Sequence, residues 1–127
     1  MKALTLFFFL IFIAIVAIAR AQIGEENKKS ADVIMKEVKT GRAYLVDVRT
    51  PEEYSTGHLV LSQNIDYNSP DFKEKISKLN KIKTVYLYCR SGNRSGKAVD
   101  TLKVMGFKSY YNIGGLEKLK SEGFSAQ

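Results

Sequence analysis

Short runs of strand-forming residues alternate with segments of helical pattern along most of this 127-residue chain. The runs at 43–48, 83–89 and 109–113 are rich in Val, Leu, Ile and Tyr, which favour strands. Strands that alternate with helices are typical of a parallel sheet, because a helix carries the chain back between parallel neighbours. The pattern predicts one α/β domain of three layers, with a central mainly parallel sheet of about five strands flanked by helices.

Capping signals locate the helices between these runs. Helices are predicted to start after Ser30, Thr50 and Ser69. At the second start, Thr50 and Glu53 form a capping-box pattern with Pro51 at the first helical position. Two further helices are expected over 94–107 and 116–124, and Gly106 is the expected stop of the first of them.

The first 21 residues have a pattern of their own. A basic residue, Lys2, precedes an uncharged apolar run over 3–19, and the A-x-A pattern at 19–21 suits cleavage before Gln22. These features predict a secretory signal peptide, so the rest of the chain is expected to be exported, either periplasmic or secreted. The expected organisation is a signal peptide over 1–21, a polar linker over 22–29 and a domain over 30–127.

A retained membrane anchor is the alternative interpretation of the same segment. Its apolar run approaches the roughly 18 residues that can span a bilayer. The domain of an anchored protein would also lie outside the cytoplasm, because Lys2 would hold the N-terminus inside. A membrane is therefore an expected partner only if this segment stays uncleaved.

The charge of the chain limits its partners. It has 20 Lys and Arg against 13 Asp and Glu, and two of the basic residues lie within residues 1–21. The remaining lysines are dispersed over helical stretches such as 71–83. Nucleic-acid binding is not expected, because it needs clustered Lys and Arg with interleaved aromatics or a recognisable module. The mildly positive overall field instead favours anionic substrates.

The only cysteine, Cys89, lies at the junction of an apolar strand and the polar loop CRSGNRSG over 89–96. A single cysteine cannot form an internal disulfide, so it is either an inert core residue or a working thiol. Ligands of parallel sheets bind at the carboxyl ends of the strands, and Cys89 is expected at such an end.

The residues after Cys89 favour a working thiol. Gly92 can take a positive φ, which turns consecutive backbone N–H groups inward into an anion-binding nest before the next helix. These donors, with Arg90 or Arg94, would lower the pKa of a thiol at the rim of the nest. A downward shift of about two units from near 8.5 makes a thiol mostly thiolate at neutral pH.

Other cysteine chemistries lack the residues that they need. The chain has no C-x-x-C for dithiol exchange, and Cys89 with the only histidine, His58, supplies two of the three or four ligands of a zinc site. No metal and no cofactor are therefore expected. A Cys-His pair stays open, provided that the two loops meet.

The loop CRSGNRS at 89–95 closely resembles the active-site loop of the rhodanese-domain sulfurtransferases. Three further segments resemble signatures of that family in the right order: LVDVRTPEEYSTGHL at 45–59, Asn64-Ile65, and YYNIGGLEKL at 110–119. The resemblance covers residues 30–124, and the ordered set is specific. It implies a rhodanese-like domain.

The resemblance also implies a thiosulfate sulfurtransferase. The Cys89 thiolate would attack the outer sulfur of thiosulfate or a similar small anionic donor, release sulfite and hold the sulfur as a persulfide. A thiol or cyanide acceptor would then remove that sulfur. The inward N–H groups would stabilise the negative charge on the thiolate and the persulfide. The expected substrate-binding residues are those of the loop: Arg90, Ser91, Gly92, Asn93, Arg94 and Ser95.

Positions outside the loop are expected to support the site. The resemblance suggests that Asp47 and Arg49 organise its floor, and a plain salt bridge is an equal alternative. His58 is expected to be structural, with a hydrogen bond at the end of its loop. Tyr86 and Tyr88 alternate with apolar residues on the central strand and are expected in the core.

The sequence departs from the family pattern at two places. It has Leu61-Ser62 where the family commonly has Gly-Ala, and Leu119 where the family commonly has Trp. Both places lie away from the nucleophile in the sequence. They leave substrate preference open, but not the thiol chemistry.

Three other functions stay open on the sequence. A phosphatase of the same fold would use a C-x5-R loop, whereas four residues separate Cys89 from Arg94, which makes a tighter nest. A persulfide carrier or sensor for a protein partner would use the same loop. A silent interaction module would need neither the thiol nor the arginines.

Overall fold

The structure is a computed structural model that describes residues 2–22 and 28–127. The predicted signal peptide falls mostly in α1, a helix over Lys2–Gln22, and its cleavage stays a prediction. Most of the predicted linker, residues 23–27, lies outside the described residues. Among the residues that are described, no helix has both the length and the apolarity to cross a membrane.

A parallel sheet of four strands forms the centre of the domain, in the order β2-β1-β3-β4. The strands are β1 (Ala43–Asp47), β2 (Gln63–Asn64), β3 (Thr84–Cys89) and β4 (Tyr110–Gly115). The predicted parallel α/β fold is confirmed, with four strands in the described residues against an approximate expectation of five. Because β1 and β3 lie in the middle, their carboxyl ends meet at the centre of one edge of the sheet.

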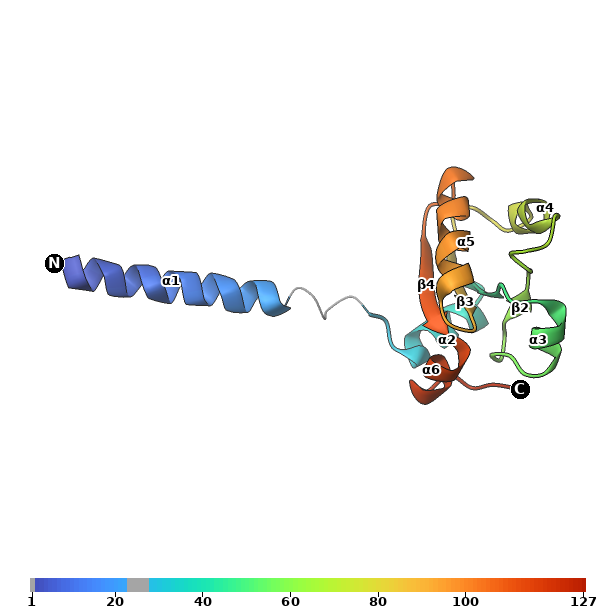
Figure 1. Ribbon diagram of the computed structural model, residues 1–127, viewed down its shortest axis with the longest axis horizontal. Coiled ribbons are helices and arrows are strands. Elements are labelled where there is room, and N and C mark those ends of the chain that lie inside the picture. Colours follow the sequence, from blue (N-terminus) through green and yellow to red (C-terminus); the bar gives the residue numbers. More distant parts are fainter. Residues whose placement is uncertain (1, 23–27) are drawn as a thin grey trace.

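Helices cover both faces of this sheet. They are α2 (Ala31–Lys39), α3 (Pro51–Ser55), α4 (Phe72–Ser77), α5 (Asn93–Val104) and α6 (Leu116–Ser121). Residues of α4 and α5 belong to one hydrophobic cluster with the sheet, and residues of α2 and α6 belong to another. In Figure 1, α5 runs alongside β3 and β4, whereas α2 and α6 lie together. The three-layer arrangement is therefore confirmed.

The capping signals predicted two of three helix starts correctly. The Ser30 hydroxyl accepts a hydrogen bond from the Val33 N–H, and both halves of the Thr50 capping box are present. The third start differs, since α4 begins at Phe72, after an N-cap residue without a capping hydrogen bond. The Ser69 carbonyl accepts from the Phe72 N–H, so the segment between them forms a turn before the helix.

Alternation along β3 decides which side chains reach which face. Val85 and Leu87 pack in the cluster with α4 and α5, whereas Tyr86 and Tyr88 pack in the cluster with α2 and α6. Both tyrosines are buried, as predicted. Cys89 is in register with Val85 and Leu87, so its side chain lies on the α5 side of the sheet.

Candidate active site

Cys89 is the last residue of β3 and is 1% exposed. Its neighbours across the sheet are the ends of two other strands, because Tyr88 pairs with Asp47 of β1 and Cys89 pairs with Gly115 of β4. The cysteine therefore stands at the carboxyl edge, the position at which parallel sheets bind ligands.

The loop after Cys89, residues 90–95, wraps hydrogen-bond donors around the sulfur. Gly92 is the N-cap of α5 and has a φ of 91°, a conformation that favours glycine. Its N–H donates to Sγ of Cys89 at 3.0 Å, and the Ser95 hydroxyl lies 3.4 Å from the same sulfur. Gly92 has no side chain to cap α5, and the N–H of this N-cap residue is directed at the sulfur.

Two opposing effects set the pKa of the thiol. Burial raises the pKa of Cys89, because it disfavours the charged form. The Ser95 hydroxyl and the backbone N–H groups of Ser95, Ser91 and Gly92 lower it, and together they outweigh burial. The pKa of Cys89 thus lies below its ordinary value. The donors that achieve this are the inward groups of the loop, as the nest argument expected.

Arg94 makes its direct contacts with a carboxylate. Its guanidinium donates to Glu53 of α3 at 2.6 and 3.0 Å, in a two-pronged pair. This pair holds the pKa of Glu53 at about 2. Arg94 therefore links the loop to α3, while the loop donors bind the sulfur. The sequence analysis missed Glu53 as part of the site, although its capping-box position already tied it to Thr50.

Arg90 lies on the other side of the loop. It is exposed, and it lines a cavity of about 290 Å³ whose lining does not include Cys89. The cavity is lined by Arg49, Thr56, Gly57, Arg90, Leu116, Glu117, Lys120 and Ala126. In this opening Arg49 is paired with Asp47 and Lys120 with Glu117, so Arg90 is the side chain that offers its charge to an anion.

Ser91 and Asn93 complete the loop. Both side chains are exposed, and Asn93 is the first residue of α5. Ser91 contributes its backbone N–H toward the sulfur. The structure thus brings the predicted substrate-binding residues into one loop around Cys89.

Asn112 of β4 is a member of the site that the sequence analysis quoted but gave no role. Its Nδ2 donates to the Gly92 carbonyl at 2.9 Å, and its Oδ1 accepts from the Ser95 hydroxyl at 2.8 Å. Asparagine is disfavoured inside strands, and that signal could have marked it.

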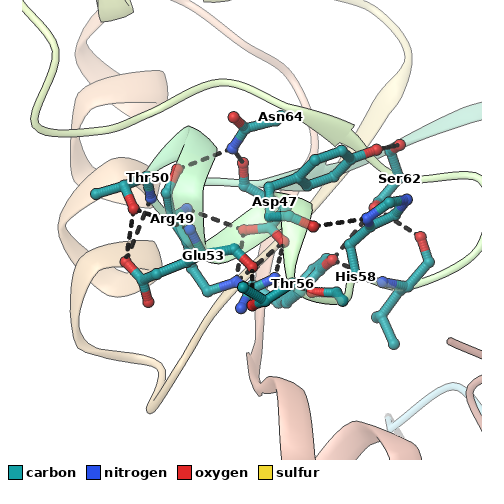
Figure 2. A network of polar contacts seen from close by, with 12 residues as sticks. Asp47, Arg49, Thr50, Glu53, Thr56, His58, Ser62 and Asn64 are labelled. Atoms are coloured by element: carbon teal, nitrogen blue, oxygen red, sulfur yellow. Dashed lines mark hydrogen bonds and ion pairs between the residues drawn. The ribbon is translucent and has the colours of Figure 1, made fainter. Parts of the chain in front are cut away.

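Asp47 and Arg49 form a buried ion pair in the middle of the polar network of Figure 2, between Asn64 on one side and Glu53 and Thr56 on the other. The Arg49 guanidinium donates to Asp47 at 2.7 Å and to the Gly57 carbonyl at 2.6 Å. Asn64 donates to the backbone carbonyls of both residues. This network fixes the loop between β1 and β2, which fits the salt-bridge alternative for these two residues.

His58 is held by its own loop. Its Nδ1 lies 2.8 Å from the Tyr54 carbonyl, and its ring stacks on that of Tyr54 with centroids 3.7 Å apart. Its backbone pairs with that of Gln127. These contacts fit the structural role expected for His58, and its ring nitrogens contact Tyr54 and Gln127.

Fold and site together define a three-layer α/β domain with one thiol in an anion-binding loop at the edge of a parallel sheet. A family model described as Rhodanese-like domain matches residues 30–122. The chain therefore belongs to the rhodanese-like domain family.

Two curated relatives and one solved structure illustrate the similarity. YqhL of Bacillus subtilis is 38% identical over 78 residues, which are 61% of this chain and 60% of YqhL. Thiosulfate sulfurtransferase PspE of Escherichia coli is 37% identical over 76 residues, which are 58% of this chain and 71% of PspE. A solved rhodanese with anions from E. coli superposes with a TM-score of 0.56 at 30% identity, covering 67% of this chain and 96% of that one.

The family and the similarity to the sulfurtransferase PspE support sulfur transfer as the general activity. A thiol at the end of a strand, with donors aimed at its sulfur, is an arrangement suited to that chemistry.

Proposed function

We propose that this protein moves sulfane sulfur from thiosulfate, or a similar small anionic donor, to a thiol or cyanide acceptor through a persulfide on Cys89. The observation that carries the proposal is the convergence of the Gly92 N–H and the Ser95 hydroxyl on Sγ. These donors favour the charged sulfur, and the thiolate is the nucleophile of this chemistry.

The proposed reaction has two steps. In the first, the Cys89 thiolate attacks the outer sulfur of thiosulfate, a new S–S bond forms, and the old S–S bond breaks. Sulfite leaves with the electron pair of the broken bond. In the second step, the acceptor attacks the outer sulfur of the persulfide and releases the thiolate of Cys89. No metal or cofactor takes part in either step.

The loop provides the electrostatics for both steps. The N–H groups of Ser91, Gly92 and Ser95 lie against Sγ, where they stabilise the thiolate before the first step and again when the second step releases it. Arg90, the exposed residue directly after Cys89, attracts the anionic donor. Arg94 acts through its pair with Glu53, which holds the loop against α3.

The size of the loop favours sulfur over phosphate as the substrate. The helix N-terminus is already occupied by Sγ, which accepts the Gly92 N–H at 3.0 Å. A phosphoryl group needs several such donors for its three outer oxygens. The four-residue spacing from Cys89 to Arg94, together with the Arg94–Glu53 pair, leaves fewer free donors for it.

Cyanide-dependent formation of thiocyanate from thiosulfate tests the proposal. We expect turnover in the wild-type protein and none in Cys89→Ser. Turnover of an aryl phosphate with none on thiosulfate would instead indicate a phosphatase. A persulfide that forms but is not turned over would indicate a carrier for a protein partner.

We also propose that residues 1–21 direct export and are removed before Gln22. The basic residue, apolar run and A-x-A pattern support this proposal. N-terminal sequencing of the protein from fractionated cells tests it. A mature chain that starts at Gln22 in the periplasmic or secreted fraction is expected, and an intact chain in the membrane fraction would indicate a retained anchor.

A further inference from the structure

Asn112 connects the two ends of the cysteine loop. Its side-chain amide donates to the Gly92 carbonyl at 2.9 Å, and its oxygen accepts from the Ser95 hydroxyl at 2.8 Å. Gly92 and Ser95 are also the residues whose N–H and O–H groups lie 3.0 and 3.4 Å from the sulfur. One side chain from β4 therefore contacts both residues that donate most directly to Cys89.

The orientation of this amide follows from its partners. The Oδ1 atom accepts a second hydrogen bond, from the Gly114 N–H at 3.1 Å, while Nδ2 faces a carbonyl. A flipped amide would place a donor against the Gly114 N–H and an oxygen against the Gly92 carbonyl. Three partners thus fix Asn112 in one arrangement.

The Ser95 hydroxyl has one proton and two candidate acceptors, Oδ1 of Asn112 and Sγ of Cys89. While the thiol is neutral, the closer Asn112 oxygen receives the proton. When the sulfur is charged, a hydrogen bond to it is stronger than one to a neutral amide, so the hydroxyl turns to the sulfur. Asn112 thus holds the hydroxyl oxygen 3.4 Å from the sulfur before ionisation, so that only the O–H bond has to rotate when the sulfur becomes charged.

We propose that Asn112 is a positioning residue for the Cys89 thiolate, acting through Gly92 and Ser95. It holds the Gly92 carbonyl on the far side of the loop, so that the N–H of the same residue faces the sulfur, and it holds the Ser95 oxygen in place. Positioning by Asn112 favours the thiolate through two donors, the Gly92 N–H and the Ser95 hydroxyl. Competition between Asn112 and the sulfur for the Ser95 proton opposes the thiolate through one donor. Loss of Asn112 should therefore disfavour the thiolate on balance.

A role of Asn112 in turnover rests on the proposed sulfur transfer. The reactivity of the Cys89 thiol, however, can be measured without turnover. The rate of alkylation of Cys89 by iodoacetamide as a function of pH gives the midpoint of thiol ionisation. Four forms of the full chain are compared: the wild type, Asn112→Ala, Ser95→Ala and the double variant. Asn80→Ala is the matched control, because it loses a loop hydrogen bond to the Ile82 N–H at the opposite edge of the sheet.

Both single variants are expected to raise the midpoint by about one pH unit, since each weakens hydrogen bonds to a charged group. Because Asn112 acts partly through Ser95, its shift in the Ser95→Ala background should be at most about half as large. Asn80→Ala should leave the midpoint unchanged. Asn112→Ser, which is too short to reach both loop partners, gives the same test if the alanine variant does not fold.

An unchanged or lowered midpoint in Asn112→Ala, or a shift of equal size in both backgrounds, would overturn the inference. The result is separable from the proposed function. A wild-type protein without sulfur transfer but with the coupled midpoint shifts would refute the function and leave the positioning role. Normal sulfur transfer without those midpoint shifts would support the proposed function and refute the positioning role of Asn112.

Discussion

The guanidinium of Arg94 forms two hydrogen bonds with the carboxylate of Glu53, at 2.6 and 3.0 Å. The arginine belongs to the first turn of α5 and the glutamate to the first turn of α3. The pair therefore joins the two loops that leave β3 and β1 at the carboxyl edge of the sheet. The pair stabilises the contact between these two loops, which is the frame of the site. It also engages Arg94, which the sequence suggested as a direct ligand of the substrate.

Glu53→Gln should weaken this frame in a pH-dependent way. Glutamine can keep the capping box but not the charge. The pKa of Glu53 is about 2, below its ordinary value of 4.5, so its stabilisation is present above pH 4.5 and is lost as the pH falls toward 2. We expect the free energy of unfolding to drop by about 1 to 2 kcal/mol at pH 7, a value reduced for partial exposure, and the difference to vanish near pH 2.

Denaturant unfolding at several pH values measures this difference. Glu52→Gln, an exposed neighbour in the same helical turn, is the control and should change stability by less than about 0.5 kcal/mol. A Glu53→Gln effect of the same size at pH 7 and at pH 2 would show that the charge of the pair does not matter.

Arg90→Gln should weaken binding of the anionic donor more than the chemical step. Arg90 is exposed and follows Cys89 directly in the chain, so it acts on the donor through its charge. We expect KM for thiosulfate to rise by about fivefold, kcat to stay within about twofold, and the difference to shrink at high salt. Lys108→Gln, at the opposite edge of the sheet, should change neither. Equal losses in both variants would point to net charge alone.

Gly115→Ala should disrupt the site by steric overlap. A Cβ at Gly115 would collide with the Arg90 carbonyl oxygen, because β4 and the cysteine loop approach each other closely there. We expect a loss of about 3 kcal/mol in the free energy of unfolding and a large loss of sulfur transfer.

Gly41→Ala is the matched control for that steric effect. Gly41 has a φ of 77°, and apart from its two chain neighbours no described residue has an atom within 4 Å of the position of its Cβ. It should cost about 1 kcal/mol for backbone strain and leave activity intact. If both variants behave alike, the close approach at Gly115 is not what constrains the loop.

Tyr88→Phe should destabilise the protein without affecting sulfur transfer. The buried Tyr88 hydroxyl accepts from the Leu59 N–H at 2.9 Å and donates to the Ser62 hydroxyl. Its removal leaves the buried Leu59 N–H without that acceptor, which costs about 1 to 3 kcal/mol. Thermal unfolding measures the effect, with Tyr111→Phe as a half-exposed control on the same sheet. Unchanged stability in Tyr88→Phe would contradict the assignment of these hydrogen bonds.

The fold could be predicted from local patterns, because the strand-forming runs, the helix-capping residues and the helix-ending glycines all indicate the same alternation of strands and helices. The alternation of strand runs with capped helices led to the parallel three-layer domain. Two details were less accessible. β2 has two residues, too few for a recognisable run, and the start of α4 depends on the turn after Ser69. Pairing with β1 decides the first, and the local turn in which the Phe72 N–H donates to the Ser69 carbonyl decides the second.

The cysteine loop could also be predicted, because its donors are close to Cys89 in the sequence. The positive φ of Gly92 and the inward N–H groups follow from local chain geometry. The partners of Arg94 and Ser95 could not be predicted, because Glu53 and Asn112 lie 41 and 17 residues away. Only the packing of α3 and β4 against the loop brings them there.

The mass of the intact protein after treatment with thiosulfate tests the central claim most directly. The proposed reaction predicts that Cys89 gains one sulfur atom, that cyanide removes it, and that Cys89→Ser gains none. A wild-type protein of unchanged mass, under conditions in which iodoacetamide alkylates Cys89, would contradict the claim, because the thiol would then be reactive and yet take no sulfur.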